Sequence, residues 1–139
     1  MNRREEVIER WFSMWLQKHD LGIGDIFTEE AIYVESWGPE YRGVRKIKQW
    51  FEEWNTRGTV VQWDIKQYFH KGNQTMVEWY FKNEMGDGTE EAFDGVSLIQ
   101  WEADDRIGFL KEFGCNNNHY DPYQEGETPR FQEEPAKWF

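Results

Sequence analysis

Acidic residues embedded in apolar segments constrain what this chain can fold into more than any other feature. In the second half of the sequence, Glu78, Asp94 and Glu112 each stand beside large apolar residues in stretches that resemble strands. A charged group is rarely buried without a partner, because leaving water is costly for it. Carboxyls among aromatic side chains are therefore either paired for structural reasons or poised for chemistry.

The periodicity of apolar residues predicts an α+β fold. Amphipathic helices are expected over residues 2–19 and 44–56, with a short helix near 25–27 and a strand at 31–35 between them. Four further strands are expected as a meander over residues 61–69, 75–82, 92–101 and 106–115. We therefore predict a curved, mostly antiparallel sheet wrapped on the N-terminal helices.

Several of these strands carry apolar side chains on both faces, which predicts a sheet that is covered on both sides. The two helices provide one cover. A partner subunit is the simplest source of the second, so we expect a homodimer that forms through the sheet.

Chain length and composition predict the domain organisation and the kind of interior. Residues 1–115 are expected to form one domain. Residues 116–139 form a tail without periodicity, whose aromatic side chains predict that it packs on the domain or on a partner. Aromatic residues make up 18% of the chain, including nine Trp, which favours a large interior or a flat apolar binding surface.

Charge and residue spacing exclude several functions. A net charge of -11 makes nucleic acid a poor partner, because phosphates would be repelled. No apolar run is long enough for a membrane span, and charges interrupt any signal-like start, so a cytoplasmic protein is expected. His19, His70 and His119 lack the spacing of metal ligands, and Cys115 is the single cysteine, so neither a metal nor an internal disulfide is expected.

The spatial relation of Asp94 and Glu112 depends on one hairpin. A three-residue loop at 103–105 pairs Glu102 with Arg106 and places Val96 opposite Glu112, with Asp94 one step along on the same face. Two carboxylates so close repel each other, and one then keeps its proton near neutral pH. Three interpretations stay open: groups satisfied structurally, pocket residues without catalysis, or general acid/base catalysis. Glu78 is expected to face solvent or to lie in an interface.

The tryptophans also have two interpretations. Trp11, Trp15, Trp50 and Trp54 recur at helical spacing, which is typical of core packing. The alternative is that some of them line a ligand cavity.

The order of elements resembles the nuclear-transport-factor-2-like, or SnoaL-like, superfamily over about residues 3–115. The local matches are Tyr33-Val34-Glu35, Tyr41-Arg42-Gly43-Val44, Val77-Glu78-Trp79-Tyr80-Phe81, Phe93-Asp94-Gly95-Val96-Ser97 and Arg106-Ile107 followed by Leu110-Lys111-Glu112-Phe113. The resemblance implies a cystatin-like cone with a deep apolar pocket, often as a homodimer. It implies ketosteroid isomerisation, polyketide ring closure, epoxide hydrolysis or dehydration, and in many members only binding of ligands or proteins.

The limonene epoxide hydrolase branch gives a residue-level comparison. Its site uses a Tyr and an Asn two residues apart, an Arg and an Asp two apart on one strand, and a second Asp on the last strand. Tyr33, Asp94 and Glu112 match the Tyr and the two Asp positions, whereas Glu35 replaces the Asn and Ala92 the Arg. Water activation there needs the Arg to hold one carboxylate ionised beside the other, so the absence of the Arg and the Asn argues against hydrolysis and leaves proton transfer next to a carbonyl open.

We therefore expect a cofactor-independent acid/base enzyme of isomerase, polyketide-cyclase or dehydratase type that acts on a small, mostly apolar molecule. A ligand-binding module without turnover and a protein-assembly module are the alternatives. The expected catalytic residues are Asp94, Glu112, Glu35 and Tyr33. The expected ligand-binding residues are Trp15, Trp50, Trp54, Tyr80, Val96 and Leu98.

Overall fold

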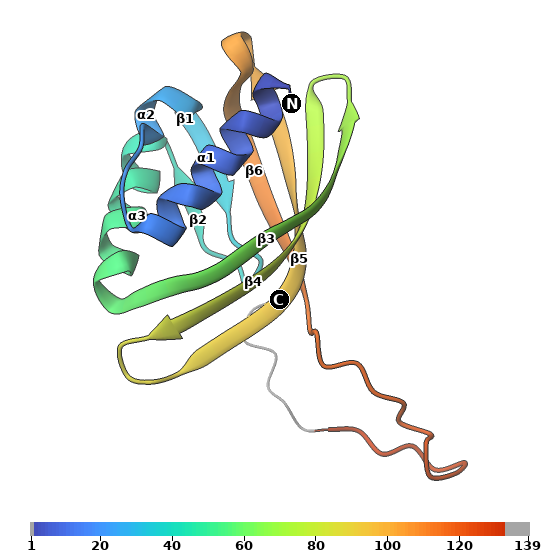
Figure 1. Ribbon diagram of the computed structural model, residues 1–139. Coiled ribbons are helices and arrows are strands. Elements are labelled where there is room, and N and C mark those ends of the chain that lie inside the picture. Colours follow the sequence, from blue (N-terminus) through green and yellow to red (C-terminus); the bar gives the residue numbers. More distant parts are fainter. Residues whose placement is uncertain (1, 133–139) are drawn as a thin grey trace.

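A curved sheet wraps around two long helices in the computed structural model, which describes residues 2–132 (Figure 1). The elements in chain order are α1 (Arg3–Gln17), α2 (Ile23–Ile26), β1 (Phe27–Val34), β2 (Glu40–Arg42), α3 (Val44–Arg57), β3 (Gly58–Lys71), β4 (Gln74–Met85), β5 (Glu90–Glu102), the short 3-10 helix η1 (Ala103–Asp105) and β6 (Arg106–Cys115). The predicted α+β class is confirmed. The short strand β2 falls partly in a segment that the sequence predicted as a loop.

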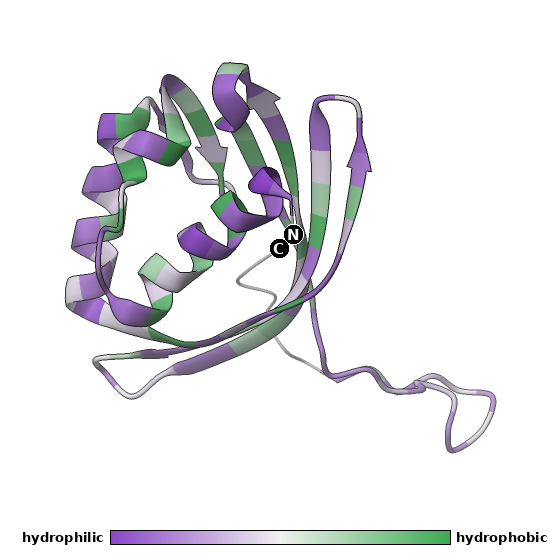
Figure 2. Ribbon diagram, turned by 45° about the horizontal axis from the view of Figure 1, so that its top comes forward, coloured by the Kyte–Doolittle hydropathy of each residue, from purple (hydrophilic) through white to green (hydrophobic). Residues whose placement is uncertain are grey.

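Within the described residues the six strands follow the order β2-β1-β6-β5-β4-β3. All neighbouring pairs are antiparallel except β1 and β6, which are parallel. Register shifts interrupt the β3–β4 ladder at two places, and such bulges bend and twist a sheet. The long β3 and β4 strands therefore curl around the helices, and the sheet stays open (Figure 2).

Helix α1 begins as its sequence predicts. The backbone N–H of Glu5 donates to Asn2 Oδ1 at 2.8 Å, and Asn2 Nδ2 donates back to Glu5 Oε2 at 3.0 Å. Asn2 is thus the N-cap, and its side chain satisfies one N–H group that the first helical turn leaves without a partner. The expected apolar face is buried at Ile8 and Trp11, whereas Leu16, which the same periodicity placed on that face, is 42% exposed.

A glycine lets one large ring lie flat against the sheet. Gly95 on β5 stands opposite Trp79 on β4. A Cβ atom at Gly95 would lie 2.4 Å from the Trp79 ring and 2.6 Å from the Phe113 carbonyl oxygen, closer than side chains tolerate. Trp79 is 1% exposed and its Nε1–H donates to Ser97 Oγ at 3.0 Å. The concave face of the sheet is thus fixed by close packing at its centre.

The described part of the tail turns back on itself. The backbone N–H of Arg130 donates to the Pro122 carbonyl at 2.8 Å, and that of Gln132 donates to the Tyr120 hydroxyl at 3.0 Å. Figure 1 shows this segment leaving the end of β6 and running away from the body. Residues 116–132 therefore do not lie over the domain, packing on a partner stays a prediction, and Trp138 and Phe139 lie outside the described residues.

Among residues 2–132, none of the helices combines the length and the apolar character that a membrane crossing needs.

Candidate functional site

A cavity of about 660 Å³ opens between the two long helices and the concave face of the sheet. This size is typical of small-molecule sites. Aromatic side chains dominate its walls: Trp15, Tyr33, Trp37, Tyr41, Trp50, Trp54, Trp63, Trp79, Phe81 and Phe93. The polar lining includes two inner carboxyls, Glu35 and Glu112, and the amide of Asn83.

The aromatic wall is an array of rings in contact. Trp50 on α3 stacks on Tyr41 of β2, with centroids 4.5 Å apart and planes 11° apart. Trp15 on α1 meets Trp50 at 4.8 Å and Trp54 edge-on at 5.5 Å. Such contacts hold large rings in fixed positions, so the wall is rigid and flat rather than adaptable.

Glu112 on β6 is the most perturbed carboxyl of the site. The Tyr33 hydroxyl donates to its Oε2 at 2.5 Å, and Trp11 Nε1 donates to the Tyr33 oxygen at 3.4 Å. Burial raises the pKa of Glu112 to about 8; the Tyr33 hydrogen bond opposes the rise and the charge of Glu35 adds to it. Burial also raises the pKa of Tyr33 well above its ordinary value, with Glu112 adding to the effect.

Glu35, which follows β1 directly, is the second inner carboxyl. The Tyr41 hydroxyl donates to its Oε2 at 2.7 Å. Burial raises the pKa of Glu35, whereas hydrogen bonds from Tyr41 and Trp37 and the charge of Arg57 lower it. The pKa of Tyr41 is raised as well, through burial and its bond to Glu35. Glu35 thus has more stabilisation for its charged form than Glu112 has.

The two carboxyls have different surroundings and stand close enough to influence each other. At neutral pH a carboxyl with a pKa of about 8 is mostly protonated, so Glu112 is suited to donate a proton or a hydrogen bond. Glu35 accepts hydrogen bonds that favour its ionised form, so it is suited to act as a base. An acid and a base in one aromatic-walled cavity are the components of general acid/base catalysis.

The structure brings together most of the residues that the sequence selected. Tyr33, Glu35 and Glu112 line the cavity, as do the three expected wall tryptophans, Trp15, Trp50 and Trp54. Their placement agrees with a shared site, and their roles stay predictions.

The register that was expected to join Asp94 to Glu112 is wrong. Glu102 does pair with Arg106, but the ladder shifts between Gln100 and Trp101, so Glu112 stands opposite Ser97 instead of Val96. The extra residue is Gly108 on β6, where a Cβ atom would lie 2.5 Å from the Glu102 side chain. Because side chains alternate along a strand, one extra residue moves Asp94 and Glu112 to opposite faces of the sheet.

Four expected site residues consequently lie on the outer face of the sheet. Asp94 stands opposite Cys115 and forms an ion pair with Lys66 at 3.1 Å. The other three, Tyr80, Val96 and Leu98, share that face and do not line the cavity. On β5 it is Glu91 and Phe93 that face the cavity. Asp94, which matched the first carboxylate of the epoxide hydrolase branch in sequence, is therefore not part of this cavity.

Sequence reasoning also missed three contributors. Tyr41 was expected in a loop before the helix, whereas β2 aims it at Glu35. Asn83 and Phe93 face inward because odd-numbered residues of β4 and β5 share the concave face. The small residues Gly95 and Ser97 on that parity were a signal, since small side chains on a strand mark where large ones from neighbours must fit.

Within residues 2–132, no group of three His, Cys, Asp or Glu side chains converges as a metal site would require.

Comparison with known proteins places the chain in context. The family model described as SnoaL-like domain matches residues 8–108. No curated protein matches the chain. Among solved structures, a hypothetical protein with a ketosteroid isomerase-like fold from Catenulispora acidiphila, in complex with trimethylamine, aligns with a TM-score of 0.70 at 16% identity, over 81% of this chain and 86% of that one.

Two further structures show the same fold. An LEH-like epoxide hydrolase from M. tuberculosis aligns with a TM-score of 0.71 at 12% identity, over 81% of this chain and 82% of the other. A steroid delta-isomerase from Pseudomonas aeruginosa aligns with a TM-score of 0.61 at 12% identity, over 84% of this chain and 82% of the other. At these identities the likeness shows the fold and leaves the chemistry to the residues.

Proposed function

Because the chain belongs to the SnoaL-like domain family, we propose that its cavity is the active site of a cofactor-independent acid/base enzyme acting on a small, mostly apolar molecule. The observation that carries this proposal is the pair of unlike carboxyls in one aromatic cavity. Glu112 is held against Tyr33 with a raised pKa, and Glu35 is held against Tyr41. The similar fold of a steroid delta-isomerase supports the reaction class by analogy only.

The proposed reaction is proton transfer next to a carbonyl. Glu35, as the carboxylate, takes a proton from the carbon beside the carbonyl, and the electrons of that C–H bond move into an enolate. Glu112, still protonated, donates a hydrogen bond to the developing oxyanion, in the way that a neutral acid in an apolar site does. Glu35 then returns the proton to another carbon of the enolate, which completes an isomerisation. In a substrate with a hydroxyl on the β-carbon, the enolate instead expels that hydroxyl, which takes the proton from Glu35 and leaves as water, so the net result is a dehydration.

Exchange of substrate protons for deuterium tests this proposal without the natural substrate. A panel of cyclic β,γ-unsaturated ketones is incubated in deuterated buffer and followed by NMR for exchange and by absorbance for conjugation. We expect Glu35→Gln to lower the rate by about 10²–10⁴-fold, the usual contribution of a general base. Glu84→Gln, a change at an exposed position on β4, serves as the control and should leave the rate unchanged. Equal rates in wild type and Glu35→Gln would contradict the proposal.

A ligand-binding module without turnover is the second candidate. The observation that favours it is the hydrogen bond from the fully buried Tyr33, which occupies part of the Glu112 carboxyl. Under this alternative, ligands bind in the cavity, but the wild type catalyses no proton exchange. Glu35→Gln then changes only the affinity for these ligands.

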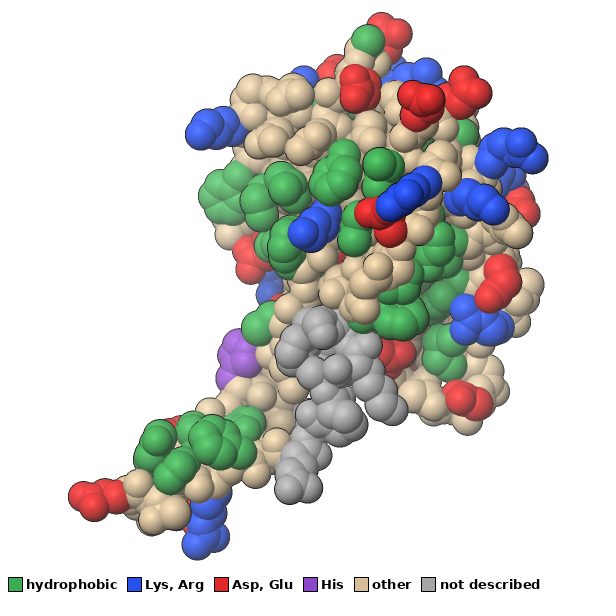
Figure 3. Space-filling view, turned by 180° about the vertical axis from the view of Figure 1, so that it is seen from behind, with side chains coloured by type: hydrophobic (Ala, Val, Ile, Leu, Met, Phe, Trp, Pro, Cys, Tyr) green, Lys and Arg blue, Asp and Glu red, His purple; other side chains and the backbone are tan. Residues whose placement is uncertain are grey.

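We also propose that two copies associate through the outer face of the sheet. Phe69 and Phe113 leave 58% and 44% of their surface exposed, and apolar side chains gather on the body in the view from behind (Figure 3). Contiguous apolar surface of this kind favours association. Light scattering on a sizing column should give a dimer mass for the wild type and a monomer mass for Phe113→Asp; a monomer in both would contradict the proposal.

A further inference from the structure

We propose that the ligand of this cavity carries a positively charged nitrogen, as an amine or a quaternary ammonium, on an apolar body. The inference rests on the proposed function for the location of the site and adds the class of molecule that the site selects. Three features of the cavity point to it: unpaired carboxyls, electron-rich walls and a buried acceptor.

The inner carboxyls lack a cation of their own. Among residues 2–132, neither Glu35 nor Glu112 forms an ion pair with Lys, Arg or His; each is held by a tyrosine hydroxyl instead. Arg57 lies at the rim, but its guanidinium is engaged by Glu53 at 2.7 Å. Glu91 adds a negative charge to the lining, and Lys46, an exposed residue that forms no ion pair with either inner carboxyl, adds a positive one. An anionic ligand is repelled here, and a cationic one supplies the missing counter-charge.

The walls favour the same charge. Cations bind over the faces of Trp, Tyr and Phe rings, with Trp the strongest of the three, and enclosures built from several such rings recognise quaternary ammonium groups. This cavity has five Trp in addition to Trp79, two Tyr and two Phe in its lining. Rings gathered beside two carboxyls attract a cation by two independent effects, whereas an uncharged apolar ligand uses only their surface area.

Asn83 adds a buried acceptor. Its side chain lies in the cavity wall, the residue is 6% exposed, and Oδ1 receives no hydrogen bond from the described part of the chain. An amide oxygen without a partner is costly to bury, and an N–H group of a protonated amine is a donor that satisfies it. A quaternary ammonium has no such donor, so this position separates the two kinds of cation.

The test uses two molecules of nearly the same shape. Choline and 3,3-dimethylbutan-1-ol differ in charge at one central atom, and benzylamine adds a cation that carries N–H donors. Tryptophan fluorescence measures the three dissociation constants. We expect choline to bind at least about tenfold more tightly than the alcohol.

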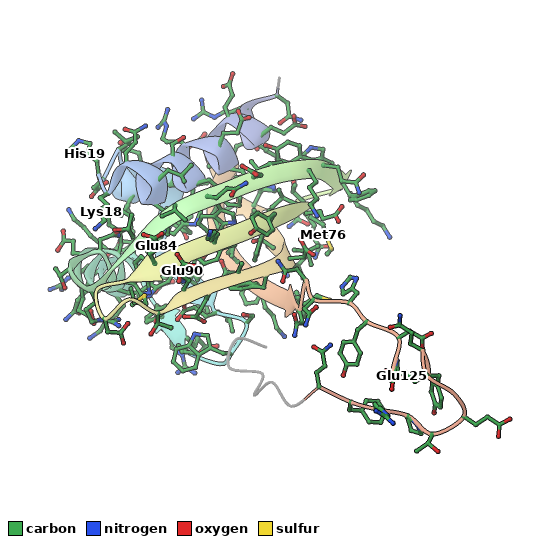
Figure 4. The ribbon with its side chains drawn as sticks, turned by 60° about the horizontal axis from the view of Figure 1, so that its bottom comes forward. Lys18, His19, Met76, Glu84, Glu90 and Glu125 are labelled. Atoms are coloured by element: carbon green, nitrogen blue, oxygen red, sulfur yellow. The ribbon has the colours of Figure 1, made fainter. Side chains whose placement is uncertain are left out.

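A pair of matched variants assigns the effect. The double change Glu35→Gln with Glu112→Gln should abolish the preference for choline while keeping the weak binding of the alcohol. The control, Glu84→Gln with Glu90→Gln, removes two carboxyls from exposed positions that pair across β4 and β5 (Figure 4). It should leave the preference unchanged, because neither side chain lines the cavity and water and salt screen their exposed charges.

Each outcome has a distinct meaning. If choline and the alcohol bind with equal affinity and each displaces the other, the cation inference is overturned. The apolar cavity of the proposed function then stays intact. No binding of any of the three would overturn both. A preference for choline that survives in the inner double variant, or that disappears in the outer one, would show that the selectivity does not come from the cavity carboxyls and would also overturn the inference.

Discussion

The concave face of the sheet has two ends that use tryptophan differently. At the end near the start of α1, Trp101 is 4% exposed and its Nε1 donates to Thr75 Oγ1 at 2.8 Å. At the cavity end, Trp15 and Trp63 are almost equally buried, yet their Nε1 groups have no partner within the described residues. Two groups depart from this division: the Tyr68 hydroxyl has no partner within residues 2–132, and Trp79 lines the cavity although its Nε1 donates to Ser97 Oγ.

The difference teaches which end was shaped for stability and which for a ligand. A buried N–H without an acceptor costs free energy, so a packed core satisfies it, as Thr75 does for Trp101. At the cavity end, unpartnered indole and amide groups stand beside carboxyls that lack cations. Costs of this kind gather where a bound molecule is expected to offset them.

The largest contrast is expected from deleting one tryptophan at each end. Trp101→Ala empties a packed site and removes the donor to Thr75, so we expect a loss of about 3–5 kcal/mol in the free energy of unfolding. Trp54→Ala removes a half-buried ring from a wall that already borders open space, so we expect only about 1–2 kcal/mol. Urea unfolding at pH 7 measures both.

The ratio of the two losses is the informative quantity. If Trp54→Ala destabilised the protein as much as Trp101→Ala, the cavity wall would be part of the packed core, and the division between the two ends would disappear. A choline titration of the folded Trp54→Ala protein completes the comparison. Loss of a residue that contacts the ligand should weaken choline binding, whereas loss of a purely structural residue should leave it unchanged.

The elements were predictable from the sequence because local patterns determine them. The capping pair of Asn2 and Glu5 begins the first helix, and alternation defined the central strands to within a few residues at their ends. The family match over residues 8–108 agrees with the resemblance that the order of elements suggested. The short strand β2 was not predicted, because three residues carry too little periodicity to be distinguished from a loop.

The site was only partly predictable, because it depends on register. Tyr33, Glu35 and Glu112, which the sequence selected as catalytic residues, line the cavity, and their roles stay predictions. Asp94 was misplaced because Gly108 inserts one residue into β6, and the period of two turns such an insertion into a change of face. A bulge depends on long-range pairing, and a lone glycine is only a weak signal of one.

A medium-sized effect is expected from the pH dependence of stability. The pKa of Glu112 is about 8 in the folded protein against an ordinary 4.5, so this group favours folding most below pH 4.5, and the benefit is lost as pH rises to 8. Glu112→Gln cannot ionise and should remove this decline. Because the residue Glu112 as a whole is only half-buried, water screens part of this effect, and we expect the variant to gain only about 1–3 kcal/mol relative to wild type between pH 5 and pH 9.

Chemical unfolding at several pH values provides the measurement, with Glu84→Gln as the control for loss of one exposed negative charge. Parallel pH profiles for wild type and Glu112→Gln would mean that Glu112 titrates normally, and the acid assigned to the cavity would then be absent.

The smallest effects should separate the two ends most cleanly, because they concern single polar groups. Thr75→Val removes the acceptor of Trp101 Nε1 and a hydrogen-bond partner of His70, so we expect a loss of about 1–3 kcal/mol at nearly constant volume. Asn83→Leu removes a buried oxygen that has no hydrogen-bond partner among residues 2–132, so we expect a change within about 0.5 kcal/mol of zero, or a slight gain in stability. The same Asn83→Leu protein should bind benzylamine more weakly and choline unchanged, since only the amine offers N–H donors. A large destabilisation by Asn83→Leu with no change in benzylamine affinity would assign this amide to the packed structure instead of the ligand site.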